Sequence, residues 1–183
     1  MRIITGKYKG RQLQSSKDRS IRPTTNKIKE YIFEILGEFT SNARVLDLFS
    51  GSGSLGIEAI SRGAQAVTFV DISQNSLTIL RKNLTAIKVV EPYSIVKRDV
   101  IRFLKQNTAS FDLVFADPPF KWNQFNEMIS LTLKPENLNA EGILVIESEK
   151  SHNINWDGEN FSVFRQKTFD RSVITFLSRE DSK

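Results

Sequence analysis

The stretch Leu46-Asp47-Leu48-Phe49-Ser50-Gly51-Ser52-Gly53-Ser54-Leu55-Gly56 decides the fold of this chain. It begins as an apolar strand, turns at its glycines and continues as a helical pattern. Gly51 and Gly53 tolerate positive φ angles and leave bare backbone for a ligand, whereas Gly56 lets the helix approach the strand closely. The pattern predicts a strand, a tight turn and a helix that together bind a nucleotide cofactor through backbone N–H groups.

The carboxylate of Asp47 bears on which cofactor the loop holds. The glycine spacing also matches the dinucleotide fingerprint, so the glycines alone do not exclude a nicotinamide cofactor. A carboxylate at the end of the strand would repel a pyrophosphate, but would attract the cationic amino-acid end and the sulfonium of S-adenosylmethionine. Asp47 equally fits a role in which it binds N–H groups of the loop. We expect S-adenosylmethionine and leave the role of Asp47 open.

Two further carboxylates follow predicted strands, where a doubly wound sheet binds its ligands. Asp71, twenty residues after Gly51, would accept hydrogen bonds from both ribose hydroxyls and repel a ribose 2′-phosphate. Asp99 would accept from the adenine amino group, or would instead cap the helix that follows it. The predicted cofactor-binding residues are Asp47, Phe49, Gly51, Gly53, Gly56, Asp71, Ile72 and Asp99.

Strand and helix patterns alternate from Ala43 onward, which is typical of an α/β fold with a mostly parallel, Rossmann-like sheet. The predicted strands are 44–49, 66–71, 93–97, 111–116 and 142–147. The predicted helices are 55–62, 76–87, 100–106 and 125–133, preceded by a helix that Thr24 or Thr25 caps and that runs to about Phe39. Runs 161–165 and 172–177 are β-rich with no helix between them, so we expect a C-terminal antiparallel hairpin.

The positive charge is concentrated at the start of the chain. The net charge is +5, yet residues 1–29 carry nine Lys or Arg against a single Asp. Runs 2–5 and 11–14 flank Gly6-Lys7-Tyr8-Lys9-Gly10, which predicts a small basic β-hairpin. An ordered basic element with an aromatic residue favours nucleic-acid binding over a merely solvated face. The predicted nucleic-acid-binding residues are Arg2, Lys7, Tyr8, Lys9, Arg11 and Arg22.

The motif Asp117-Pro118-Pro119-Phe120 follows a predicted strand and carries the chemistry. Two prolines hold the backbone rigid, so that the Asp117 carboxylate and the Pro118 carbonyl can both accept from one NH2 group. Phe120 offers a flat face for a nucleobase. A proline turn that only ends a strand is the plainer interpretation, but its coupling to a cofactor loop favours catalysis. We predict Asp117, Pro118 and Phe120 as the catalytic residues.

The composition excludes several kinds of chemistry and indicates where in the cell the protein acts. With no cysteine, the chain has no disulfide, no thiolate metal site and no cysteine nucleophile. Its one histidine, His152, lies in a polar stretch and is predicted to be solvated, so no metal site is expected. No apolar run is long enough to span a membrane and no signal peptide is evident, so we expect a cytoplasmic protein.

Taken together, these motifs resemble the RsmD-type family of 16S ribosomal RNA guanine-N2 methyltransferases, which have the class I S-adenosylmethionine-dependent fold. The resemblance covers nearly the whole length, from the N-terminal segment through Arg22-Pro23-Thr24-Thr25 and the glycine loop to Asp117-Pro118-Pro119-Phe120. It implies that residues 1–24 contact RNA and that 25–183 form the methyltransferase domain. It further implies that residues 22–24 cover the active site. We therefore expect a monomeric enzyme whose partner is 16S rRNA, within the small ribosomal subunit or an assembly intermediate.

The sequence also departs from this family and admits other functions. The family commonly has Tyr at the position of Phe120 and Ala at that of Ser50, and residues 169–172 match its usual corner poorly. An N6-adenine methyltransferase acting on RNA or DNA would use the same acceptors for its amine. A non-catalytic RNA-binding protein would use the basic segment alone, and a nicotinamide oxidoreductase would use the glycine loop without the Asp-Pro-Pro motif.

Overall fold

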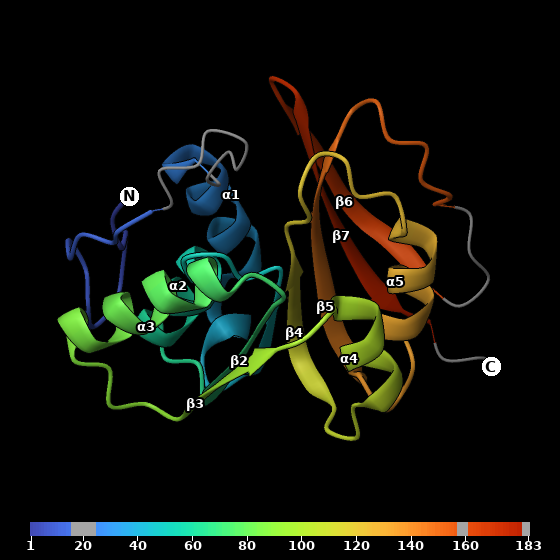
Figure 1. Ribbon diagram of the computed structural model, residues 1–183. Helices are drawn as coiled ribbons and strands as arrows, with labels where there is room; N and C mark the ends of the chain where they lie inside the picture. The colour runs from blue at the N-terminus through green and yellow to red at the C-terminus, as the bar shows by residue number, and fades with distance from the viewer. Residues whose placement is uncertain (16–24, 157–160, 181–183) are drawn as a thin grey trace.

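The computed structural model describes residues 1–15, 25–156 and 161–180 of the chain. One seven-stranded sheet has the order β3-β2-β1-β4-β5-β7-β6 (Figure 1). The strands are β1 (Arg44–Leu48), β2 (Ala66–Asp71), β3 (Tyr93–Lys97), β4 (Phe111–Ala116), β5 (Leu138–Glu149), β6 (Phe161–Phe169) and β7 (Ser172–Arg179). The helices are α1 (Asn26–Leu36), α2 (Ser54–Ser61), α3 (Gln74–Ile87), α4 (Val100–Gln106) and α5 (Phe125–Thr132), and a 3₁₀ turn, η1 (Gly37–Thr40), follows α1.

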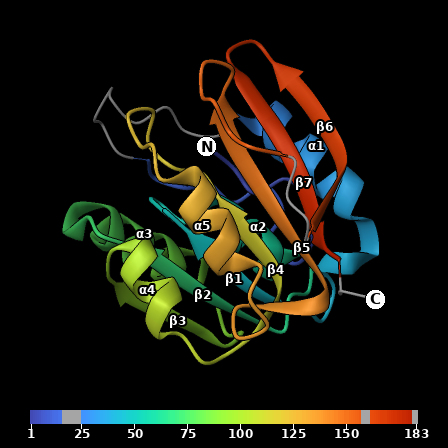
Figure 2. The ribbon, with the colours of Figure 1, turned by 90° about the vertical axis from the view of Figure 1, so that its right-hand side faces the viewer.

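Strands β1 to β5 pair in parallel, and β7 pairs antiparallel with both of its neighbours. This arrangement confirms the predicted α/β class with its C-terminal hairpin. Side chains alternate between the two faces of the sheet, as Val45 and Leu46 do on β1, and they build a separate core on each face. Helices α1, α2 and α3 cover one face, whereas α4 and α5 cover the other, as Figure 2 shows.

The predicted element boundaries hold best in the middle of the chain. Strands β2, β3 and β4 and helix α4 have the bounds that the sequence predicts. Helix α1 begins after Thr25, whose side chain accepts from Ile28 N at 3.3 Å, but it ends at Leu36 because Gly37 adopts a φ of 49°. Strand β5 begins earlier than predicted, at Leu138. The turn between β6 and β7 is tight, with Asp170 at a φ of 48°.

The N-terminal segment, residues 1–15, forms only a short version of the predicted β-hairpin. Its two arms share one antiparallel bridge, Arg2 with Gln12, flanked by backbone hydrogen bonds from Ile3 N to Arg11 O at 3.0 Å and from Leu13 N to Met1 O at 2.8 Å. Beyond this bridge, the backbone N–H groups of Ile4 and Thr5 donate to the carboxylate of Glu58, at 2.8 and 3.0 Å. The first arm therefore divides its hydrogen bonds between the second arm and helix α2.

Tyr8 corrects a second prediction about this segment. Its ring is only 8% exposed and belongs to the core that packs on α1, α2 and α3. Its hydroxyl donates to Glu91 at 2.7 Å, and Lys7 Nζ contacts the same carboxylate. Burial, the largest influence, raises the pKa of Glu91, but the hydrogen bonds from Lys7 and Tyr8 outweigh it and hold that pKa at about 2. Tyr8 thus anchors the segment and offers no ring to a base.

Among the described residues, no helix is both long and apolar enough to cross a membrane.

Candidate functional site

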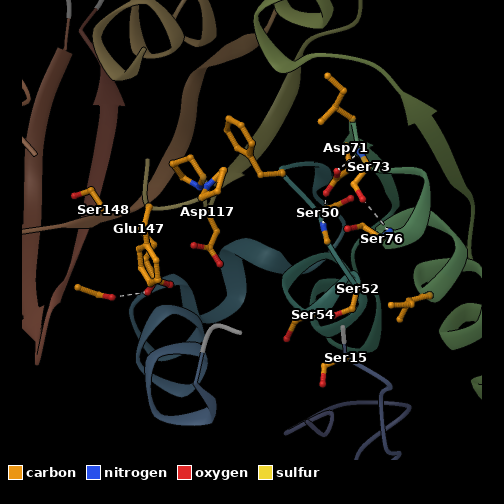
Figure 3. A pocket seen from close by; sticks show the side chains of 18 of the residues that line it. Ser15, Ser50, Ser52, Ser54, Asp71, Ser73, Ser76, Asp117, Glu147 and Ser148 are labelled. Atoms are coloured by element: carbon orange, nitrogen blue, oxygen red, sulfur yellow. Dashed lines mark hydrogen bonds between the residues drawn. The ribbon is translucent and has the colours of Figure 1, made fainter. Parts of the chain in front are cut away.

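A cavity of about 250 Å³ opens at the carboxyl ends of the parallel strands. The turns after β1 and β2 form one wall, and the ends of β4, β5 and β7 form the other (Figure 3). Strands β1 and β4 are sheet neighbours, although β2, β3 and their helices separate them in sequence. The cavity therefore lies where the strand order reverses, which is where doubly wound sheets bind ligands.

The glycine loop forms the first wall with an unusual backbone. Phe49, Gly51 and Gly53 all have positive φ angles, of 57°, 54° and 85°. Gly53 N donates to Ser50 O at 2.7 Å, and Ser50 N donates to Val70 O at 3.0 Å, which ties the loop to β2. Phe49, Ser50 and Gly51 line the cavity directly. Two of the predicted cofactor residues, Phe49 and Gly51, thus lie at the cavity surface.

Asp47 and Gly56 hold the loop from beneath and are not among the residues that line the cavity. Asp47 Oδ2 accepts from Gly56 N at 2.9 Å, so the structure shows the loop-binding role that the sequence left open for Asp47. A Cβ atom on Gly56 would overlap the ring of Phe69, which confirms why glycine is needed there. Burial raises the pKa of Asp47 to about 7. The hydrogen bond from Gly56 lowers that pKa and the charge of Asp71 raises it, but both influences are smaller than that of burial.

Asp71 and Ile72 form the far end of this wall. Asp71 Oδ2 accepts from Gly51 N at 2.8 Å and Oδ1 accepts from Ser73 N at 2.7 Å, so the carboxylate is fixed at the cavity surface. Each oxygen keeps a second lone pair that can accept from a ribose hydroxyl. Ile72 is 67% exposed and borders the same space, where it offers an apolar surface to a flat ring.

Two other predicted cofactor residues lie outside the cavity lining. Asp99 caps α4, its side chain accepting from Arg102 N at 3.0 Å, which is the alternative that the sequence admitted. Gly53 supports the loop from the side of α3, because a Cβ atom there would overlap Leu80. Asn83 of α3 also donates to Ser52 O at 2.9 Å. Gly53 and Asn83 thus shape the loop rather than border its ligand space.

Ser50 provides a test of whether these residues fit a cofactor. Its side chain is 7% exposed and lines the cavity, yet its hydroxyl has no hydrogen-bond partner among the described residues. A buried hydroxyl without a partner is costly, so this one marks a place where a polar ligand group would complete the structure. Together with Asp71 and Ile72, it gives the wall a polar end, a ribose acceptor and an apolar surface. These features fit an adenosyl amino acid.

The opposite wall carries Asp117, Pro118, Pro119 and Phe120, which the structure brings to the same cavity as the glycine loop. His152 also lines it, and its Nε2 lies 3.0 Å from Phe120 O. Glu149 N donates to His152 Nδ1 at 3.2 Å, so Nε2 carries the proton and donates to that carbonyl. His152 lies in a loop and is partly exposed, as predicted, but the sequence reasoning missed that its ring holds the end of the Asp-Pro-Pro-Phe motif.

Glu147 at the end of β5 is a cavity residue that the sequence reasoning missed. Its Oε1 accepts from the buried hydroxyl of Ser172 at 2.7 Å, and both residues line the cavity. A signal was present, because Glu147 ends an apolar run just as Asp71 and Asp117 do. His152 had no such signal, since its contact with Phe120 joins positions 32 residues apart.

The predicted nucleic-acid residues divide into three groups. Arg2, Lys7, Lys9 and Arg11 are exposed. Tyr8 is buried, as described above, and Arg22 lies outside the described residues. Met1 and Ser15, the ends of the N-terminal segment, line the cavity next to the glycine loop. The exposed basic side chains thus belong to a segment that borders the cavity.

A family model described as "Conserved hypothetical protein 95" matches residues 1–178. The chain belongs to this RsmD-type family. It is 36% identical to the ribosomal RNA small subunit methyltransferase D of Haemophilus influenzae over 92% of this chain and 88% of that relative. It is 32% identical to the Escherichia coli protein of the same name over 98% of this chain and 90% of that relative.

Solved structures agree with this membership of the RsmD-type family. An Escherichia coli structure described as a methyltransferase matches with a TM-score of 0.87 and 31% identity, and the match covers 98% of both chains. A methyltransferase structure complexed with S-adenosylhomocysteine matches with a TM-score of 0.70 at 16% identity, covering 87% of this chain and 50% of that chain, which shows the shared fold. The fold is thus that of the class I methyltransferases, whose methyl donor is S-adenosylmethionine.

Proposed function

We propose that this protein transfers a methyl group from S-adenosylmethionine to the exocyclic N2 amine of a guanine in 16S ribosomal RNA of the small subunit. One observation carries the proposal: the Asp117-Pro118-Pro119-Phe120 motif borders the same cavity as Gly51, Asp71 and Ile72. The cofactor-side wall and the amine-accepting wall thus share one space. The names of the curated relatives support the assignment to small-subunit rRNA.

The chain's own groups suit an amine that is a weak nucleophile. S-adenosylmethionine, when bound, would supply an electrophilic methyl group: its S–CH3 bond breaks to leave S-adenosylhomocysteine, and the amine gives up one proton to the Asp117 carboxylate or to solvent. The carboxylate of Asp117 and the carbonyl of Pro118 accept hydrogen bonds from the two N–H groups of the amine, which turns the nitrogen lone pair toward the cofactor wall. Phe120 is exposed at the cavity and stacks on the base. His152 holds the Phe120 carbonyl and so positions that ring.

The N-terminal segment supplies the RNA contact in this proposal. Arg2, Lys7, Lys9 and Arg11 are exposed, and the ends of their segment border the cavity. Phosphate contacts at such a rim position an RNA strand without reading its sequence. The protein acts as a monomer in this scheme, since the described residues of one chain provide both walls.

The test is to incubate the protein with labelled S-adenosylmethionine and small subunits that lack the modification, and to identify the methylated nucleoside by mass spectrometry. We expect N2-methylguanosine in 16S rRNA. The Asp117→Asn variant should lose about a hundredfold or more in turnover, by analogy with the removal of one preorganised polar contact. Detection of N6-methyladenosine instead would refute the guanine assignment and support an adenine methyltransferase.

The matched control is Asp112→Asn, which places the same substitution at the opposite end of β4. Asp112 accepts from Arg44 N at 2.7 Å and from Asn139 and is absent from the cavity lining. Both variants should bind S-adenosylhomocysteine like the wild type in calorimetry. Equal turnover in the two variants would remove Asp117 from the mechanism.

A further inference from the structure

Glu147 lies near the end of β5, and Asp117 directly follows the adjacent strand β4. The register pairs Ala116 of β4 with Ile146 of β5, so the two acidic residues that follow are also neighbours. Adjacent strands lie about 4.8 Å apart. Side chains two residues apart on a strand point to the same face of the sheet. Asp117 lies two residues after Phe115, and Glu147 lies two residues after Val145. Phe115 and Val145 both belong to the core on the α1 side. The two carboxyl groups therefore share one face of the sheet and one end of the cavity, as Figure 3 shows.

The position of the Glu147 carboxyl is fixed by the neighbouring strand. Ser172 at the start of β7 is buried and donates its hydroxyl to Glu147 Oε1 at 2.7 Å. A carboxyl that a buried hydroxyl holds at a cavity wall is a preorganised acceptor. The hydroxyl of Ser50, buried in the opposite wall without a partner among the described residues, is independent evidence that this cavity receives a polar ligand.

The chemistry of the purine edge indicates what this second acceptor does. In guanine, the N1–H donor is adjacent to the N2 amine, so the two groups present a continuous row of donors. In adenine and in 2-aminopurine, N1 carries a lone pair and can only accept. Asp117 and Glu147 line one cavity from adjacent strands, so a base whose amine is held by Asp117 and the Pro118 carbonyl can turn its N1 edge toward Glu147.

We propose that Glu147 is a specificity-determining residue, whose carboxyl accepts from N1–H of the target guanine. This inference rests on the proposed function and adds to it the group that distinguishes guanine from adenine. A buried acceptor gains a hydrogen bond from guanine, but meets a lone pair on a base that has no proton at N1. Ser172 is a positioning residue, because its hydroxyl holds the Glu147 carboxyl.

The experiment compares guanine with 2-aminopurine at the methylated position. The target nucleotide is mapped first, and 16S rRNA is then rebuilt by splinted ligation with either base there and assembled into subunits. Both bases carry the 2-amino group, but only guanine has N1–H. The wild type should methylate guanine at least about tenfold faster than 2-aminopurine, the size expected for one base-reading hydrogen-bond pair.

The Glu147→Gln variant should bring the two rates within about threefold of each other, because its amide can donate to an unprotonated N1. The Ser172→Ala variant should also reduce the ratio of the guanine rate to the 2-aminopurine rate, but by a smaller factor. The matched control is Glu127→Gln, which alters an exposed glutamate paired with Lys105 on the far side of the sheet and should keep the wild-type ratio. Calorimetry with S-adenosylhomocysteine should give wild-type affinity for all three variants.

Two results would overturn the role of Glu147. One is a wild-type enzyme that methylates both bases equally fast, and the other is a Glu147→Gln variant that slows both reactions by the same factor, as a purely structural residue would. Failure of the wild type to form any N2-methylguanosine would instead refute the proposed function, so the two failures are distinguishable.

Discussion

At the scale of single residues, the hydroxyl of Ser50 is buried without a partner among the described residues, so we expect it to contribute to ligand binding rather than to folding. Ser50→Ala should leave the free energy of unfolding unchanged or raise it by about 1 kcal/mol. The same variant should bind S-adenosylhomocysteine about two- to tenfold more weakly, because one hydrogen bond to the ligand is lost. Thermal unfolding and calorimetry measure the two effects. A less stable variant with unchanged affinity would contradict this account of the hydroxyl.

Asp47 makes the stability of the protein depend on pH. Burial raises its pKa from 3.8 to about 7 in the folded chain, so between these values the folded state binds more protons than the unfolded one. The contribution of Asp47 to stability is fully present below about pH 4 and is lost as the pH rises to about 7. As the pH rises from about 4 to about 7, the wild type should therefore lose stability relative to the Asp47→Asn variant, whose side chain does not titrate. Above about pH 7 the difference in unfolding free energy between the two proteins should become constant. Denaturant titrations at several pH values would show this, and a constant difference would argue against the raised pKa.

At the scale of elements, a buried ionic cluster attaches the N-terminal segment to α1 and α2. Glu58 accepts from Ile4 and Thr5, and it also pairs with Arg62 Nε at 3.0 Å and Lys29 Nζ at 3.2 Å. Lys29 is 0% exposed and donates to Arg2 O at 2.8 Å. Burial, the largest influence, lowers the pKa of Lys29, while Glu58 opposes that effect. Three elements thus depend on one carboxylate.

Glu58→Gln should lower the free energy of unfolding by about 3–5 kcal/mol, because it leaves Lys29 buried beside a neutral group. Hydrogen exchange at the amides of Ile4 and Thr5 should accelerate before the rest of the chain unfolds. The control is Glu34→Gln, which changes an exposed glutamate on α1 and should have little effect. Similar stabilities for the two variants would show that the segment is held in another way.

The elements were predicted unequally well because some of them depend on partners that are distant in sequence. Strands 66–71, 93–97 and 111–116 were predicted to the residue, because each is a short β-rich run bounded by turn residues. The N-terminal hairpin was predicted from local alternation and is shorter than predicted, because the amides of Ile4 and Thr5 bond to Glu58, more than fifty residues away. No local pattern contains that partner. Tyr8 was assigned to RNA for the same reason, although its hydroxyl bonds to Glu91.

At the scale of the whole molecule, positive charge at one end should dominate RNA affinity. Lys9 and Arg11 are exposed and have no ion pair among the described residues, whereas Lys7 is paired with Glu91. Lys9→Ala and Arg11→Ala should each reduce the slope of log K against log salt by about one, if each removes one phosphate contact. Lys7→Ala should reduce it less. Filter binding to 16S rRNA over a range of salt concentrations measures the slopes, and identical slopes in all variants would make the segment a solvated face.

The site was predicted where one strand end and its turn contain the chemistry, and missed where the sheet brings strands together. Gly51, Asp71 and Asp117 follow apolar strands and line the cavity as predicted. Asp99 caps a helix instead, because an aspartate before a helix fits both roles equally well from sequence. Glu147 becomes significant only beside Asp117, and that adjacency depends on the register of β4 with β5.

The strand order has a consequence for how such a protein can diversify. In the proposed function, the wall for the methyl donor comes from the turns after β1 and β2, whereas the wall for the acceptor base comes from residues at one end of β4, β5 and β7. The two walls meet only where β1 pairs with β4. On that proposal, substitutions beside the cavity on β4, β5 and β7 should redirect the protein to another nucleobase without disturbing its loading with donor. Catalytic retargeting and donor affinity are separable traits in this architecture, open to independent drift or to independent engineering.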